Sequence, residues 1–205
     1  MAKHTKAYHH GDLRAALLAE AATMITEGGA ASVTMRALGE RVGVSRTAPY
    51  RHFTDKSALL LAVAAAGFDR LNDRLQAVDA AAPRSGVERI RRLGEEYVRF
   101  ALENPAHYRL MYGAEAIARA EQPELRESAN RLFEQLVEVI RAQQRSGRIK
   151  RQDPQTQAYV AWSAVHGLAM LVVEGQIKTT VDVEALARQA TATLLDGMRP
   201  RKARG

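Results

Sequence analysis

Apolar residues recur at helical spacing along almost the whole chain of 205 residues, and no segment shows the alternation of a half-buried strand. Near the N-terminus, Leu13, Leu17 and Ala21 have this spacing, in a helix expected to run from about Asp12 to the two glycines at 28–29. We therefore expect an all-α protein of about nine helices.

Two short helices separated by the sequence VGVS at 42–45 form the most informative part of this pattern. Thr34 can cap the first of them, and Ser45 can cap the second, which is expected to continue to His52 or the following residue. Gly43 permits the positive φ that the tight turn of a helix-turn-helix requires. The second helix is too short and too polar to be stable alone, so its neighbours must hold it in place.

The outer face of this second helix suits DNA. Thr47, Tyr50 and Arg51 share one side of it, and Arg46 lies next to them. Side chains of these types suit phosphate oxygens and base edges in a major groove. The alternative is an ordinary solvated helical face.

Basic charge lies at the two ends of the chain. The net charge is +7; residues 1–60 hold eight Lys or Arg and five Asp or Glu, residues 199–205 hold four Lys or Arg, and residues 61–198 balance. This distribution indicates a polyanion that the N-terminal part contacts. Cys is absent and the N-terminus lacks the apolar region of a signal peptide, so we expect a cytoplasmic protein.

No metal, cofactor or membrane span is expected. The six histidines lack the spacing of a metal site, and neither a glycine-rich phosphate loop nor a nucleophile elbow occurs. A Ser-His-Asp constellation can be scattered through a sequence, but a small all-α chain with a DNA-binding head does not favour an enzyme. The uncharged stretch 154–173 contains too many polar residues to span a bilayer, so we expect a helix buried inside the protein.

Two segments of the sequence resemble a known family. YHHGDLRAALLAEAATMI and SVTMRALGERVGVSRTAPYRHFTDKSALL, within residues 8–64, resemble the DNA-binding domain of TetR-family transcriptional regulators. NPAHYRLMYG and AWSAVHGLAML resemble the C-terminal region of the WHG-domain subgroup. The resemblance implies a helix-turn-helix domain at 1–60, a helical effector-binding and dimerisation domain at 61–198 and a basic tail at 199–205.

The same resemblance implies a homodimer on an inverted-repeat operator, with recognition helices in successive major grooves. It places Thr34 and Arg36 near a phosphate or base edge, and Ser45 as the cap of the recognition helix and a phosphate contact. The residues expected to face bases are Arg46, Thr47 and Ala48. The residues expected to hold phosphates are Tyr50, His52 and Lys56.

The sequence departs from the family pattern at two positions. Pro49 stands where a branched apolar residue is usual, and it deletes the amide that would bond the Ser45 carbonyl. The recognition helix is therefore expected to begin late or as a tight 3₁₀ turn, which leaves the register of base contacts open. Gly39 replaces the usual Ala and costs about 0.5–1 kcal/mol of helix propensity.

The uncharged helix is apolar all round and is therefore expected to be buried all round. One stripe of it is expected to join the last helix in a four-helix dimer interface formed by Val160, Ala164, Leu168, Leu171, Leu186, Ala190 and Leu194. In the arrangement that the TetR resemblance implies, the other stripe, Trp162, His166 and Met170, is expected to form the wall of a ligand pocket whose further lining is Tyr97, Phe100, Tyr108, Met111, Tyr112 and Phe133. The alternatives are that both sets belong to the core of one protomer, with His166 hydrogen-bonded internally.

These expectations combine into a repressor that a small molecule releases from DNA. No formal charge falls on the pocket stripe, which favours a neutral, partly aromatic effector. One alternative is an architectural DNA-binding protein without an effector, which the near-neutral region 61–198 disfavours. The other is an enzyme or interaction module that has lost DNA binding, which the polarity of residues 45–56 disfavours.

Overall fold

The computed structural model describes residues 10–81, 88–113, 122–178 and 180–200, and these ranges contain eight α-helices, one 3₁₀ helix and no strand. The all-α prediction is confirmed, and the short helix expected at 113–121 lies almost wholly outside the described residues. The elements are α1 (His10–Ser32), α2 (Met35–Val42), the 3₁₀ helix η1 (Ala48–Arg51), α3 (Lys56–Ala81), α4 (Glu88–Glu103), α5 (Pro105–Tyr112), α7 (Pro123–Arg145), α8 (Pro154–Val173) and α9 (Val183–Met198).

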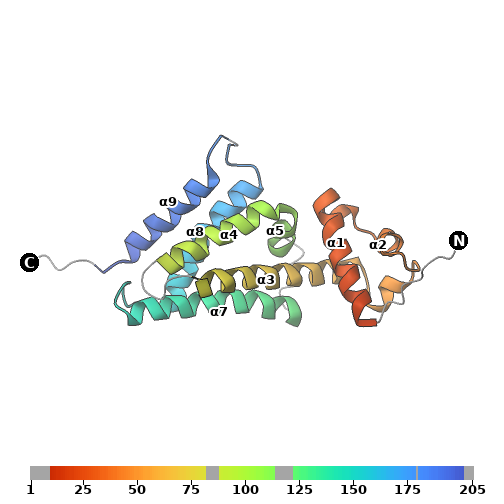
Figure 1. Ribbon diagram of the computed structural model, residues 1–205, viewed down its shortest axis with the longest axis horizontal. Helices are drawn as coiled ribbons and strands as arrows, with labels where there is room; N and C mark the ends of the chain where they lie inside the picture. The colour runs from red at the N-terminus through yellow and green to blue at the C-terminus, as the bar shows by residue number, and fades with distance from the viewer. Residues whose placement is uncertain (1–9, 82–87, 114–121, 179, 201–205) are drawn as a thin grey trace, which may run out of the picture.

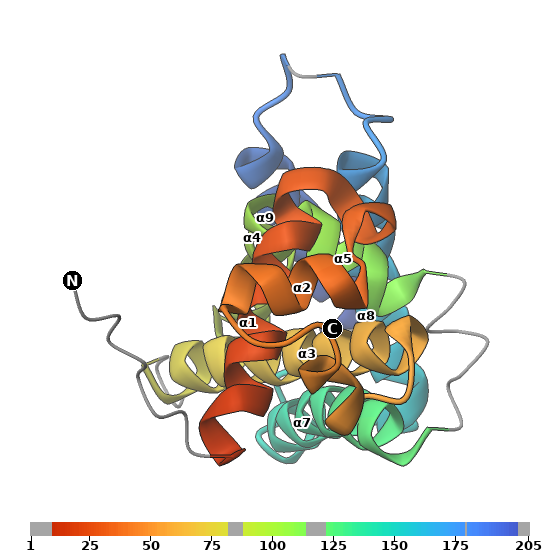
Figure 2. The same ribbon diagram turned by 90° about the vertical axis from the view of Figure 1, so that its right-hand side faces the viewer.

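The molecule has a small N-terminal head and a larger helical bundle, and the long helix α3 runs from one into the other (Figure 1). α1, α2 and η1 surround the beginning of α3 in the head, whereas α4, α7, α8 and α9 pack around the rest of it or on one another (Figures 1 and 2). Because α3 spans Lys56–Ala81, one continuous helix crosses the domain boundary that the sequence placed at residue 60.

Each part has its own apolar core. The core of the head gathers Leu17, Leu38 and Phe53 with residues of α3 as far as Val63. The core of the bundle gathers residues of α3, α4, α5, α7, α8 and α9. Leu110 of α5 packs against both cores, so α5 bridges them together with α3.

The ends of the helices in the head follow from local sequence. Thr34 caps α2 by accepting a hydrogen bond from the Ala37 amide at 3.1 Å, and Gly43 ends it with φ of 79°, as the sequence predicted. The first helix breaks at the expected position, 28–29. Gly29 leaves helical geometry (φ 72°, ψ 173°), but helical structure continues to Ser32, whose hydroxyl donates to the Gly29 carbonyl at 2.8 Å.

α8 is long and apolar enough to cross a membrane by length and composition alone, but it packs against α4, α7 and α9. Within one protomer it is not buried all round. Val160 is 52 % exposed and Leu171 is 49 % exposed, so an apolar strip of this helix faces outward in a single protomer.

Candidate DNA-binding and ligand-binding sites

The segment expected to be a recognition helix from Ser45 to His52 is shorter than predicted. Only Ala48–Arg51 is helical, and it is 3₁₀, in keeping with the tight turn that Pro49 suggested. Ser45 does not cap it: the capping position is Thr47, which makes no capping hydrogen bond, and the Ser45 and Thr47 hydroxyl oxygens lie 3.3 Å apart. The Ser45 carbonyl accepts instead from the Ala48 amide at 3.0 Å, one residue before the proline.

The two departures from the family pattern fit each other in space. A Cβ added to Gly39 would lie 3.1 Å from the Ser45 carbonyl oxygen and 3.4 Å from Cγ of Pro49. Gly39 on α2 therefore leaves room for the proline ring and for the turn that precedes η1. Sequence reasoning treated the two positions separately, because only the folded turn brings them together.

Most of the expected DNA-contacting side chains lie on the surface of the head. Tyr50 is 56 % exposed although it is a large aromatic residue. Ala48 is an exception, because it is 9 % exposed and packs inward; the expectation that it faces bases is wrong for this structure. The other exposed members of the set are Thr34, Arg36, Ser45, Arg46 and Thr47.

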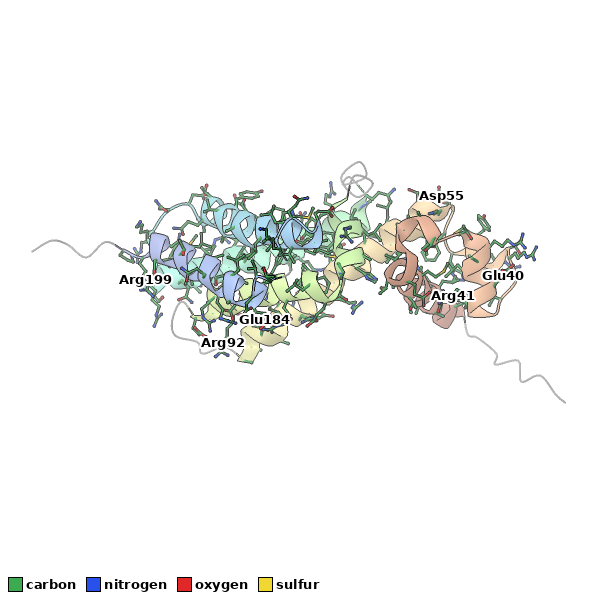
Figure 3. The ribbon with its side chains drawn as sticks, turned by 90° about the horizontal axis from the view of Figure 1, so that it is seen from above. Glu40, Arg41, Asp55, Arg92, Glu184 and Arg199 are labelled. Carbon is green, nitrogen blue, oxygen red and sulfur yellow. The ribbon has the colours of Figure 1, made fainter. Side chains whose placement is uncertain are left out.

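One acidic residue lies among the basic ones. Glu40 accepts a hydrogen bond from Nε of Arg36 at 3.1 Å and pairs with Nε of Arg46 at 3.3 Å. It lies at the end of the molecule farthest from Arg199 (Figure 3). Sequence reasoning did not consider Glu40, although its i,i+4 spacing from Arg36 is a signal for this pair.

Lys56 and His52 flank the turn into α3. The Lys56 ammonium donates to the Ala31 carbonyl at the end of α1, 3.2 Å away, and this contact fixes the lysine beside the first turn of α3. The Asp55 carboxylate caps that turn by accepting from the Ala58 amide at 2.8 Å. The His52 amide bonds back to the Pro49 carbonyl, and its side chain is partly exposed.

The bundle encloses a cavity of about 240 Å³ between α3, α4, α7, α8 and α9, with Tyr112 of α5 at its border. Its lining is largely aliphatic and aromatic, and none of the described residues that line it carries a formal charge. It opens to the surface between α7 and α8, where Asn130 and Tyr159 are exposed. Tyr159 stacks on Phe133, with 4.5 Å between ring centroids.

Four of the nine expected pocket residues line this cavity: Tyr97, Tyr112, Phe133 and Trp162. The other five do not line the cavity, so the expectation that they form the pocket is corrected. These five are Phe100, Tyr108, Met111, His166 and Met170. Phe100 and Met111 are buried in the bundle core, where Arg74 covers the Phe100 ring. Sequence reasoning missed Ile90, Leu93 and Gly94, although Ile90 and Leu93 precede Tyr97 at helical spacing.

Tyr108 and His166 belong to a hydrogen-bonded cluster behind the cavity wall. The Tyr108 hydroxyl lies 2.7 Å from Nδ1 of His166 and donates to the Tyr97 oxygen at 3.0 Å. The Tyr97 hydroxyl donates to the Tyr112 oxygen at 2.9 Å and accepts from Nε1 of Trp162 at 3.1 Å. The cluster joins three helices, α4, α5 and α8.

Burial keeps this cluster uncharged at neutral pH. It raises the pKa values of the Tyr97, Tyr108 and Tyr112 hydroxyls well above their usual value and lowers the pKa of His166 below 6.5. The three phenols therefore remain protonated throughout the physiological range.

α5 connects the cavity to the head. Tyr112, near its end, borders the cavity, while Ala106 and Leu110 pack against the core of the head. Arg109 fixes the same helix to the end of α8, through Glu174 at 2.9 Å and through the Val173 carbonyl. α5 therefore contacts both the lining of the cavity and the packing under α1.

The expected dimer residues divide into two groups. Val160 and Leu171 are exposed, and Ala164, Leu186 and Ala190 are partly exposed. The expectation is corrected for Leu168, which is only 9 % exposed in the bundle core, whereas Leu194 is partly exposed and also lines the cavity. Gly167 lies on the outward side of α8, and an added Cβ there would meet no atom within 4 Å.

Comparison with known families agrees with this architecture. The family described as "Bacterial regulatory proteins, tetR family" matches residues 17–63, which form the head. The family described as "Tetracyclin repressor-like, C-terminal domain" matches residues 90–194, slightly more than half of the chain. The chain belongs to the TetR family of transcriptional regulators. Both segments that resembled the WHG-domain subgroup lie within the second match.

Individual similar proteins cover different shares of the chain. The nucleoid occlusion factor SlmA of Vibrio vulnificus (strain YJ016) is 32 % identical over 117 residues, so the match spans just over half of that protein, 56 %, and 55 % of this chain. A protein of unknown function from Rhodococcus sp. RHA1 has a similar structure, with a TM-score of 0.84, 32 % identity and coverage of 95 % of this chain and 100 % of that one. A TetR-family transcriptional regulator from Pectobacterium atrosepticum gives a TM-score of 0.73, 28 % identity and coverage of 93 % and 96 %.

Proposed function

We propose that this TetR-family protein is a cytoplasmic, homodimeric repressor that binds an inverted-repeat operator and is released from it by a small uncharged ligand. The observation that carries the proposal is the uncharged cavity bordered by Tyr112, on the same short helix whose residues Ala106 and Leu110 pack against the head. A purely structural DNA-binding protein has no need of such a cavity.

DNA contact is assigned to the surface around η1. Exposed Arg46, Thr47 and Tyr50 suit base edges and phosphates, and Lys56 suits a phosphate beside the first amides of α3. Phosphate contacts supply most of the sequence-independent affinity, whereas base contacts specify the site.

Dimerisation is assigned to the outward strip of α8 together with α9. Val160 and Leu171 are among the few large apolar side chains that are exposed, and the small Ala164 and Gly167 between them permit close approach of a second copy. A two-fold dimer places two heads on half-sites about 34–36 Å apart, or a small multiple of that distance.

Release is a shift between two populations of the dimer. A ligand in the cavity that contacts Tyr112 favours one position of α5, and Leu110 transmits that position to the head. The coupling expected for such a device is about 1–3 kcal/mol, which changes operator affinity by roughly 5- to 150-fold.

A gel-shift experiment with genomic fragments, with and without an extract of cellular metabolites, tests this proposal. We expect the full chain to retain a small subset of fragments and the extract to release them. Retention of all fragments alike, unaffected by extract, would favour an architectural DNA-binding protein. That second candidate is kept because the matched relative SlmA is named a nucleoid occlusion factor.

A further inference from the structure

The cavity has room for a molecule of limited size. An apolar protein cavity of about 150 Å³ accommodates benzene, so about 240 Å³ has room for about ten non-hydrogen atoms. Because no charged side chain is found among its described lining residues, a carboxylate or ammonium inside it would lose its hydration without gaining a counter-charge.

The hydrogen bonds of the tyrosine cluster leave one proton without an acceptor. The Tyr108 proton goes to the Tyr97 oxygen, and the Tyr97 proton goes to the Tyr112 oxygen. Nδ1 of His166 lies 2.7 Å from the Tyr108 oxygen and 3.0 Å from the Tyr97 oxygen, and because both of those phenol protons are used, the ring nitrogen is the donor in these contacts. The chain of donors ends at Tyr112, whose own proton has no acceptor among the described residues, and Tyr112 borders the cavity.

We infer that the ligand is an uncharged molecule of about ten non-hydrogen atoms with an apolar body and one hydrogen-bond acceptor, such as a carbonyl oxygen, that binds the Tyr112 hydroxyl. This inference rests on the proposed function and names the ligand class for the same cavity. The aromatic wall formed by Trp162, Phe133 and Tyr159 suits a planar body. The donor chain behind Tyr112 polarises its hydroxyl and strengthens the bond that it gives.

Three probes that are matched in number of non-hydrogen atoms test the inference. Acetophenone carries a carbonyl acceptor, α-methylstyrene replaces that oxygen by a CH₂ group, and benzoate carries a negative charge. Equilibrium dialysis of the full chain without DNA gives the Kd of each. We expect acetophenone to bind roughly two- to tenfold tighter than α-methylstyrene, the range of one neutral hydrogen bond, and benzoate to bind weakest.

Two matched variants assign this preference to one hydroxyl. Tyr112→Phe should bring the ratio of the two uncharged Kd values to about one, whereas general damage to the cavity would weaken both probes and keep the ratio. Tyr159→Phe removes another hydroxyl from the lining and should leave the ratio unchanged. Tyr159 as a whole is more than half exposed, and its hydroxyl makes no hydrogen bond in the described structure.

Three results would overturn the inference: equal binding of the two uncharged probes to the unchanged protein, tightest binding of benzoate, or binding of none of the three. A preference that persists in Tyr112→Phe would do the same. These measurements contain no DNA, so they test the inference separately from the proposed function. If the three probes bind in the predicted order but release no DNA in a gel shift, the inference stands and the proposed repressor mechanism is refuted.

Discussion

Replacement of Gly94 by alanine probes how closely α4 approaches α9 beside the cavity. A Cβ at this position would lie 2.5 Å from Cγ2 of Thr191 and 3.1 Å from Cγ1 of Val165. Thr191 is buried, and its hydroxyl is bonded to the Ala187 and Arg188 carbonyls, so its methyl group cannot rotate away without loss of those bonds.

The size of the effect follows from two opposing contributions. Overpacking by one methyl group costs about 1–3 kcal/mol, while alanine gains about 0.5–1 kcal/mol over glycine in a helix. We expect Gly94→Ala to lower the free energy of unfolding by about 1–2 kcal/mol. Thr191→Ser removes only the opposing methyl group and should cost about 1 kcal/mol alone, by analogy with other buried one-methyl deletions.

The double variant is the decisive one. The new methyl group at position 94 occupies the space that Cγ2 of Thr191 vacates, so the double variant should be close to the original protein in stability. Urea unfolding followed by far-UV circular dichroism, at one protein concentration for all four chains, gives each midpoint and slope. If the two single effects add within about 0.5 kcal/mol, the packing argument is refuted.

Three further predictions concern charge and protonation. Glu40→Gln should tighten DNA binding in a gel shift, because a negative charge among the basic residues of the head is removed. The control Glu138→Gln removes a similar arginine pair on α7 and should leave DNA binding unchanged. Equal effects of the two variants would contradict the placement of the DNA surface. Lys56→Ala should weaken binding to all sequences alike and flatten the log K against log salt plot by about one unit; a change confined to certain sequences would refute a phosphate contact. Burial lowers the pKa values of His107 and His166 in the folded state below 6.5. As the pH falls, the unfolded chain therefore takes up protons before the folded chain does. The free energy of unfolding should keep its full value above about pH 6.5 and decrease at lower pH. Chemical denaturation between pH 7 and 5 checks this, with a smaller decrease expected for His166→Gln; a stability that rises on acidification would contradict the assignment.

The fold could be predicted because its signals are local. The cap at Thr34 and the positive φ of Gly43 depend on residues within one turn of each other, and the structure confirms them. The recognition segment was harder. A 3₁₀ turn rotates by a different angle per residue from an α-helix, so faces assigned on an α-helix do not transfer to it, and Ala48 is buried instead of exposed.

The cavity could be predicted only in part, because an aromatic residue at helical spacing suits a packed core and a cavity wall equally well. Trp162 of α8 and Tyr112 of α5 line the cavity, whereas His166 and Tyr108, each one turn away on the same helix, take part only in the hydrogen-bonded cluster. The strip of α8 that remains exposed in one protomer was expected to be buried in a dimer, and this stays a prediction, because the sequence pattern of a helix does not distinguish burial within its own protomer from burial by a second copy.

The central claim is that occupation of the cavity and binding of the operator are coupled through α5. The direct measurement is the Kd of the selected operator fragment with and without saturating ligand, together with the Kd of that ligand with and without saturating operator. Thermodynamic linkage requires the two ratios to be equal, and we predict that each equals the same factor of roughly 5–150, with ligand and operator weakening each other. An operator affinity that stays the same at saturating ligand would contradict the account.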